Sequence, residues 1–152
     1  MGVYTVEREI PVPDGPHVWL NLNQLINGVI AESDFREGFV IIQTKHTTTG
    51  LLINEDERGF KNDLLRRLTK MVPDDEYYEH DDFTKRTENI GPDERKNAVS
   101  HIRASFLQTS LSPIIFKNRQ LQLGTWQSVL FVDFDPNGRP SRNLVVQIHG
   151  EK

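Results

Sequence analysis

The sequence predicts one α+β domain over residues 1–152, with a mixed, mostly antiparallel sheet and two or three helices. Segments with alternating polar and apolar residues stand near both ends of the chain, which is typical of half-buried strands. Two segments between them carry apolar residues at helical spacing. No internal repeat or linker divides the chain, and 152 residues suffice for one buried core.

The composition favours a globular protein and excludes several classes. Hydrophobic residues make up 36% and charged residues 26% of the chain, which is unlike a disordered sequence. Cysteine is absent, so disulfides and thiolate metal sites are excluded, and imidazole and carboxylate are the strong ligands that remain. A net charge of −4 argues against general nucleic-acid binding. Apolar runs are too short to span a membrane and no secretory signal is visible, so we expect a cytoplasmic protein.

The first third of the chain predicts two strands and a helix. Val3–Val12 alternates and should form a half-buried strand, which ends at the Pro13–Pro16 turn. His17–Leu20 resumes as a short strand. Asn23 is a suitable N-cap for a helix. The apolar face of that helix would comprise Leu22, Leu25, Ile26, Val29 and Ile30.

A polar turn between two apolar strands follows. Phe39–His46 predicts a strand buried on both faces, and Leu51–Ile53 predicts the returning strand. Asp56 would cap a second helix, which Pro73 ends. The apolar face of this helix would comprise Phe60, Leu64, Leu65, Leu68 and Val72.

The polar segment Asp74–Lys96 predicts a long ordered loop, and long loops inside a compact domain are usually functional. Asn97–Thr109 predicts a short helix. Ser112–Phe116 and Leu121–Gly124 predict a hairpin.

The last part of the chain predicts two more strands. Trp126–Phe134 is heavily apolar, and Trp126 is expected to anchor a core or an interface. The Asn-Gly pair at 137–138 predicts a hairpin into Leu144–His149. In that last strand Leu144, Val146 and Ile148 should point inward.

The stretch from Lys45 to Glu55 is the most conspicuous polar feature, because buried polar groups cost free energy unless binding or chemistry uses them. Thr47, Thr48, Thr49 and Gly50 form a hydroxyl- and amide-rich turn that suits a phosphate. The alternative is a turn whose threonines are satisfied internally. Glu55 is a candidate metal ligand or base, or simply an acid favoured by the helix dipole.

Three of the five histidines, His46, His80 and His101, lie on three separate elements. If the fold brings them together, three imidazoles make a divalent-metal site with an open position. Their spacing alone does not establish this, and partly buried histidines without a ligand are the alternative. We assign no role to His17 and His149.

Charged residues near these histidines offer further candidates. Arg86, Arg95 and Arg103 are possible phosphate clamps, since a guanidinium matches two phosphate oxygens. Asp81 and Asp82 follow His80 directly and are able to orient its ring. A solvated surface is the alternative for all of them.

Five strings together resemble the YjbQ family, also called the secondary thiamine-phosphate synthase family. They are His46-Thr-Thr-Thr-Gly, Ile53-Asn-Glu, His80-Asp-Asp, Asn97-x-x-x-His101 and Leu121-Gln-Leu-Gly-Thr-Trp-Gln127. The resemblance covers about Val3 to Ile148, and the last string is highly specific. Thr49 is a departure, because many members carry alanine there.

The resemblance implies a YjbQ-like α+β fold, a homotrimer with sites near subunit contacts, and weak thiamine-phosphate synthase activity. It implies a metal cluster at His46, His80 and His101. Imidazoles favour zinc, and magnesium is possible with a diphosphate substrate. We expect Glu55, Arg86 and Arg103 to serve catalysis. The expected substrate-binding residues are Thr47, Thr48, Thr49, Gly50, Asn97 and Gln127.

The expected substrates are phosphorylated small molecules, a pyrimidine diphosphate and a thiazole phosphate. One alternative is a zinc-dependent hydrolase of a small phosphate or ester. The other is a non-catalytic trimeric protein that binds a ligand or a metal. We expect neither nucleic acid nor membrane as a partner.

Overall fold

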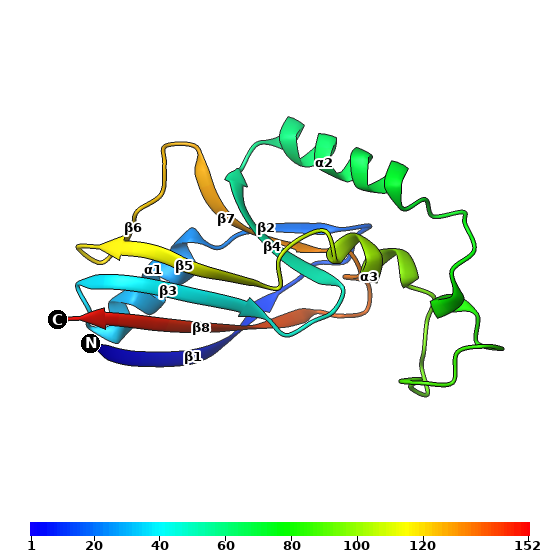
Figure 1. The fold of residues 1–152 in the computed structure, drawn as a ribbon, viewed down its shortest axis with the longest axis horizontal. Helices are drawn as coiled ribbons and strands as arrows, with labels where there is room; N and C mark the ends of the chain where they lie inside the picture. The colour runs from blue at the N-terminus through cyan, green and yellow to red at the C-terminus, as the bar shows by residue number, and fades with distance from the viewer.

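The protein is built from two antiparallel sheets and three α-helices in a computed structural model that describes residues 1–152, apart from the side chain of Ser112 (Figure 1). In chain order, the elements are β1 (Gly2–Pro11), β2 (Val18–Asn21), α1 (Asn23–Ser33), β3 (Glu37–Thr44), β4 (Thr49–Glu55), α2 (Arg58–Met71), the 3₁₀ turn η1 (Glu79–Asp81), α3 (Ala98–Ala104), β5 (Ser110–Lys117), β6 (Gln120–Leu121), β7 (Gln127–Asp133) and β8 (Ser141–Glu151).

The strands form a five-stranded sheet in the order β1-β8-β3-β5-β6 and a three-stranded sheet in the order β2-β7-β4. Every strand pairing in the described chain is antiparallel. The predicted α+β class, with a mostly antiparallel sheet and two or three helices, is confirmed. None of the helices in the described residues is long and apolar enough to cross a bilayer.

Two of the connections that pass from one sheet to the other lie at the same end of the molecule (Figure 1). Residues 45–48 lead from β3 to β4, and residues 134–140 lead from β7 to β8. The predicted hairpin at the Asn-Gly pair is therefore wrong. Gly138 has the expected positive φ of 68°, but β7 pairs with β2 and β4 whereas β8 pairs with β1 and β3. The turn was predictable, and the choice of sheet was not.

The main core lies between α1 and the two sheets, with side chains from both sheets in one cluster. The inward prediction for β8 is confirmed, since Leu144, Val146 and Ile148 are fully buried. β3 differs from its prediction. Val40 and Ile42 are buried, whereas Ile41 on the opposite face is only half-buried, because nothing in the described chain packs fully over that face.

Both predicted helix caps shift by one residue. Asn23 lies inside the first turn of α1, where its Oδ1 accepts a hydrogen bond from the Val129 N–H at 2.9 Å. Glu57, not Asp56, caps α2. Its carboxylate accepts from the N–H groups of the next helical residues, Gly59 and Phe60, while Asp56 accepts from Lys61 Nζ. Small polar residues are the usual helix N-caps, but in α2 the longer side chain of Glu57 takes this role.

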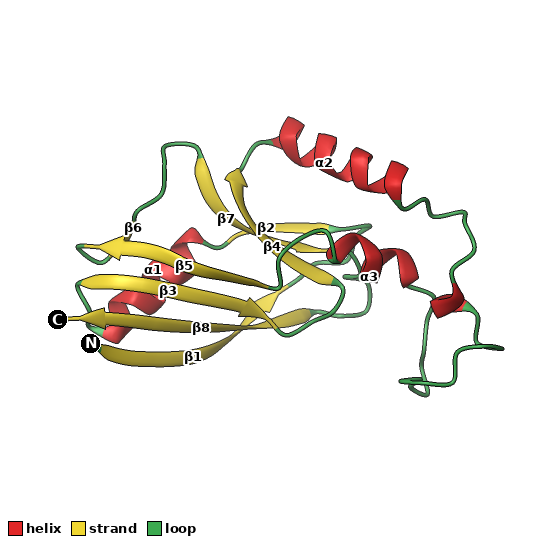
Figure 2. Cartoon of the chain, viewed as in Figure 1, coloured by secondary structure: helices red, strands yellow, loops and turns green.

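A second, smaller cluster holds α2 and α3 against the three-stranded sheet. It contains Leu68, Ala104, Val132 and Phe134. The predicted long loop follows α2 as the irregular segment that leads through η1 to α3 (Figure 2). Trp126 is 73% exposed, so it is not a core anchor in this chain.

Candidate functional site

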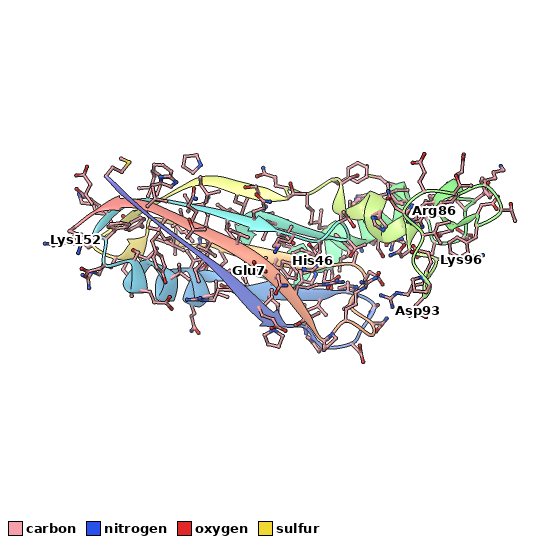
Figure 3. The ribbon with its side chains drawn as sticks, turned by 90° about the horizontal axis from the view of Figure 1, so that it is seen from below. Glu7, His46, Arg86, Asp93, Lys96 and Lys152 are labelled. Carbon is pink, nitrogen blue, oxygen red and sulfur yellow. The ribbon has the colours of Figure 1, made fainter. Side chains whose placement is uncertain are left out.

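A cavity of about 770 Å³ opens where the two crossing connections meet α3 and the loop before it. One wall, which we call the strand end, comes from the connections between the sheets. It contains Lys45, His46, Thr47, Thr48, Arg139 and Arg142. The other wall, the loop end, includes His80, Arg86, Glu94, Asn97 and His101. Figure 3 shows His46 beside the strands and Arg86 on the loop beyond them.

A buried ion pair supports the strand end. Arg142 is the second residue of β8 and lies on the same face of the strand as the buried Leu144. Only 3% of Arg142 is exposed. It donates from Nε to Oδ2 of the fully buried Asp133 at 2.6 Å, and from Nη2 to Oδ1 at 3.1 Å. Nη2 also donates to the Asp135 carbonyl at 2.6 Å. A bidentate pair of this kind fixes the guanidinium plane as well as its position.

The threonine turn is held from both sides by residues next to that pair. Phe134 N donates to the Thr48 carbonyl at 3.1 Å, and Lys45 N donates to the Asn143 carbonyl at 3.3 Å. Inside the turn, Thr49 Oγ1 donates to the His46 carbonyl at 3.0 Å. Local bonds of this kind, from a threonine hydroxyl to the backbone, are common in polar turns.

His46 has one ring nitrogen engaged by the backbone. Its Nε2 accepts a hydrogen bond from Asn143 N at 2.8 Å, so the proton of the neutral ring belongs on Nδ1. Burial lowers the pKa of His46 below its usual value, and the nearby Arg142 guanidinium lowers it further. His46 is therefore a neutral imidazole near pH 7.

Arg86 organises the loop end. Its Nη1 donates to His80 Nε2 at 3.1 Å, to the His80 carbonyl at 3.2 Å and to Glu94 Oε1 at 2.9 Å. Its Nε and Nη2 donate to the carbonyls of Glu88 and Asn89. All three guanidinium nitrogens of Arg86 therefore donate to the protein itself.

The rings of His80 and His101 lie side by side, with centroids 4.6 Å apart and planes inclined by 57°. Burial lowers the pKa of His101, and the neighbouring His80 lowers it further. Of the two roles considered for Asp81, orienting the His80 ring or lying on a solvated surface, the structure shows neither. Its Oδ1 instead accepts from the N–H groups of Asn97 and Ala98 at the start of α3, both at 3.0 Å.

A three-imidazole metal site does not fit the histidines as this chain places them. An ion needs a free lone pair on each ligating ring. The Nε2 lone pairs of His46 and His80 already accept hydrogen bonds, from Asn143 N and from Arg86. Within the described residues, no group of three or more potential ligand side chains is placed to hold an ion. The divalent ion stays a prediction from the resemblance.

The cavity brings together seven of the residues expected from the sequence. They are His46, Thr47, Thr48, His80, Arg86, Asn97 and His101. Thr49 and Gly50 lie in β4 below the turn. Thr49 Oγ1 is hydrogen-bonded to Thr44, and a side chain at position 50 would collide with Leu107.

Three expected residues lie away from the cavity. Glu55 and Gln127 pair with each other at the far end of β4 and β7, and Gln127 Oε1 accepts from Gly124 N. Arg103 donates to the Val72 carbonyl and pairs with Asp74, so it ties α3 to the end of α2. Arg95 similarly binds the Asn137 carbonyl. These corrections reflect long-range strand and helix placement, which the motifs do not encode.

The sequence reasoning missed Asp133 and the cationic side chains of the strand end, Lys45, Arg139 and Arg142. A signal for Arg142 was present. It has the same parity in β8 as the inward-facing Leu144, Val146 and Ile148, and a charged residue at an inward position predicts a buried partner.

The fold and this pocket define an α+β protein with a polar cavity beside the connections between its two sheets. The model of the family described as "UPF0047 protein YjbQ-like" matches residues 8–151. The chain belongs to the YjbQ-like family, as the resemblance predicted.

Relatives and solved structures agree with this placement. A UPF0047 protein of Archaeoglobus fulgidus is 38% identical over 74% of this chain and 78% of its own length. One from Methanothermobacter thermautotrophicus is 32% identical over 99% and 95%. The crystal structure of a YbjQ-like protein of unknown function from Sulfolobus solfataricus has a TM-score of 0.80, with 23% identity and 99% of both chains covered. A YjbQ/UPF0047 family structure from Clostridium acetobutylicum has a TM-score of 0.76, with 28% identity over 95% of this chain and 99% of that one.

Proposed function

We propose that this protein is a small-molecule transferase that joins a pyrimidine diphosphate to a thiazole phosphate in the pocket between the strand end and the loop end. The observation that carries the proposal is the convergence of three histidines and several cationic side chains on one cavity of about 770 Å³. Cavities of this size typically hold small organic ligands.

The reaction needs little covalent chemistry from the protein. The bond between the pyrimidine methylene carbon and the diphosphate oxygen breaks, and both electrons leave with pyrophosphate. The thiazole nitrogen then donates its lone pair to that carbon, which forms the new carbon–nitrogen bond. Binding both rings in line and stabilising the leaving anion are the two contributions that a protein makes to such a step.

The pocket contains groups for both contributions. Cationic side chains, including Lys45, Lys85 and Arg142, face the cavity and favour the diphosphate and phosphate groups. The adjacent rings of His80 and His101 present aromatic faces and N–H groups that suit a heteroaromatic ring.

The test is an assay of the purified protein with both substrates, followed by detection of thiamine phosphate and pyrophosphate. Reactions with each substrate alone serve as controls, and all are run with magnesium, with zinc and with a chelator. The His101→Ala variant should lose most of the activity, since it removes a ring from the pocket. His149→Ala, which alters a ring stacked on Phe39 outside the cavity, should retain it.

Other outcomes would replace the proposal. Phosphate release from one substrate alone would favour the hydrolase. Saturable binding of a phosphorylated molecule without turnover would favour a ligand-binding protein.

The homotrimer implied by the resemblance is part of the proposal. Its support is the exposure of large apolar side chains, among them Phe106, Ile115 and Trp126, which subunit contacts commonly cover. Light scattering of the purified protein should give three times the chain mass. A mass equal to one chain would exclude the trimer.

A further inference from the structure

One guanidinium nitrogen of Arg142, Nη1, makes no hydrogen bond within the described structure. In Arg86, by contrast, all three nitrogens donate to the protein. Nε and Nη2 are held by Asp133 and the Asp135 carbonyl, and no acceptor in the described chain lies within hydrogen-bond distance of Nη1. Arg142 lines the cavity, and Nη1 is not among the fully buried side-chain nitrogens that lack a hydrogen-bond partner. A cavity-lining side chain that is 97% buried and keeps N–H groups without an acceptor is suited to bind an acceptor from the cavity.

The threonine turn provides more free donors beside Arg142. The backbone N–H groups of Thr47 and Thr48 have no acceptor in the described structure. The turn is fixed next to the guanidinium, because Lys45 N binds the Asn143 carbonyl and the Thr48 carbonyl accepts from Phe134 N. Asn143 follows Arg142 in the chain, and Phe134 follows Asp133. Successive free amides next to a guanidinium are a common arrangement for binding an oxyanion.

The carboxylates that balance these cations do not face the cavity. Glu7 pairs with Lys45, Asp133 with Arg142 and Asp135 with Arg139, and none of the three acids lines the pocket. At the loop end, by contrast, Glu79, Glu88 and Glu94 all line the pocket. The strand end therefore presents donors without a carboxylate, whereas Lys85 and Arg86 at the loop end share the cavity with three carboxylates.

We propose that the strand end is an oxyanion subsite, in which Arg142 Nη1 and the Thr47–Thr48 turn bind a phosphate or diphosphate group of the ligand. The uncharged part of the ligand then extends toward His80 and His101. This inference rests on the proposed function for the ligand class. It moves the anion away from Arg86, whose three nitrogens all donate to the protein, and from Arg103, which does not line the cavity.

The test uses inorganic pyrophosphate as the probe and isothermal calorimetry as the measurement, and every titration is run both without and with a chelator. Wild-type protein should bind the probe, and Arg142→Gln should bind it at least about tenfold more weakly, since a charge-assisted donor is lost. Arg66→Gln is the matched control, because Arg66 lies on the exposed surface of α2. Equal affinity in the wild type and Arg142→Gln, or binding that the chelator abolishes, would overturn the inference.

A second measurement avoids the risk that Arg142→Gln does not fold. In amide NMR spectra of the wild type, pyrophosphate should shift the Thr47 and Thr48 signals more than those of residues 85–90. Shifts confined to residues 85–90 would overturn the subsite.

Failure of the oxyanion subsite can be distinguished from failure of the proposed transferase function. Pyrophosphate binding that depends on Arg142 without synthesis rejects the transferase alone, and synthesis with Arg142-independent binding rejects the subsite alone.

Discussion

At the residue scale, the site depends on polar side chains that the fold buries and then satisfies. Asp133 is fully buried, and its two oxygens accept from Arg142. Removing one partner of a buried pair leaves an uncompensated charge, which costs more than the intact pair contributes. The pair is therefore a requirement for the strand end rather than a large source of net stability.

The Asp133→Asn substitution should lower the free energy of unfolding by about 3 kcal/mol, because Arg142 keeps its charge without a buried counter-ion. Urea denaturation followed by circular dichroism measures this. Asp63→Asn serves as the control, since its ion pair with Arg66 is exposed, and it should leave the midpoint almost unchanged. A loss for Asp133→Asn no larger than for Asp63→Asn would contradict the pairing.

The lowered pKa of His101 predicts a stability change in weak acid. Burial keeps the pKa of the folded ring below the ordinary value of about 6.5, so the unfolded chain binds more protons just below that pH. Stability is then complete above about pH 6.5 and falls as the pH decreases from there toward the folded pKa. Urea titrations at several pH values should show a shallower fall for His101→Gln, and an unchanged fall would reject the assignment.

Residue types predicted part of the site. The alternation of inward and outward positions along β8 would have predicted Arg142 as well. The histidines and the first two threonines were recognisable because buried polar residues need a reason. Glu55, Gln127 and Arg103 lie away from the cavity, since their motifs say nothing about which end of a strand or helix faces it. Nothing in the sequence pointed to Asp133 until the structure showed its ion pair with Arg142.

At the scale of elements, the segment between α2 and α3 is organised by one side chain. Arg86 joins the η1 residue His80 to Glu88, Asn89 and Glu94. An order of this kind comes from hydrogen bonds and not from apolar packing, so it has a low local stability. The sequence predicted an ordered loop here, but the identity of the organising residue depends on the conformation.

The Arg86→Lys substitution should loosen this segment while the sheets stay intact, because an ammonium lacks the fork of donors that reaches four partners. Hydrogen exchange of the amides in residues 79–94 should accelerate by at least about tenfold, and exchange in α1 should not change. Exchange rates in residues 79–94 equal to those of the wild type would show that other contacts order the loop.

At the scale of the whole molecule, two sheets share one core. Leu51 on β4 and Phe131 on β7 belong to the same buried cluster as Val40 on β3 and Ile148 on β8. The strands themselves were mostly predictable from alternation and turn residues. Their division between sheets was not, because pairing joins segments as distant as β1 and β8.

One shared core predicts one cooperative unfolding transition. Leu51→Ala should lower stability by about 3 kcal/mol, since it leaves a cavity at a fully buried position. Tryptophan fluorescence, which includes Trp19 in the three-stranded sheet, and circular dichroism of all strands should report the same midpoint before and after the change. Separate midpoints would show that the two sheets unfold independently.

The two crossing connections also have a consequence for how the pocket varies among related chains. Each of the two connections that form the strand end joins one sheet to the other, so we expect a change in the angle between the sheets to move the strand end relative to the loop end. A volume change deep in the shared interior, at Ile26 or Phe131 for example, should therefore rotate one sheet against the other and alter ligand size preference without replacing any residue that lines the cavity. Differences in selectivity between members with identical pocket residues would then originate in their interiors.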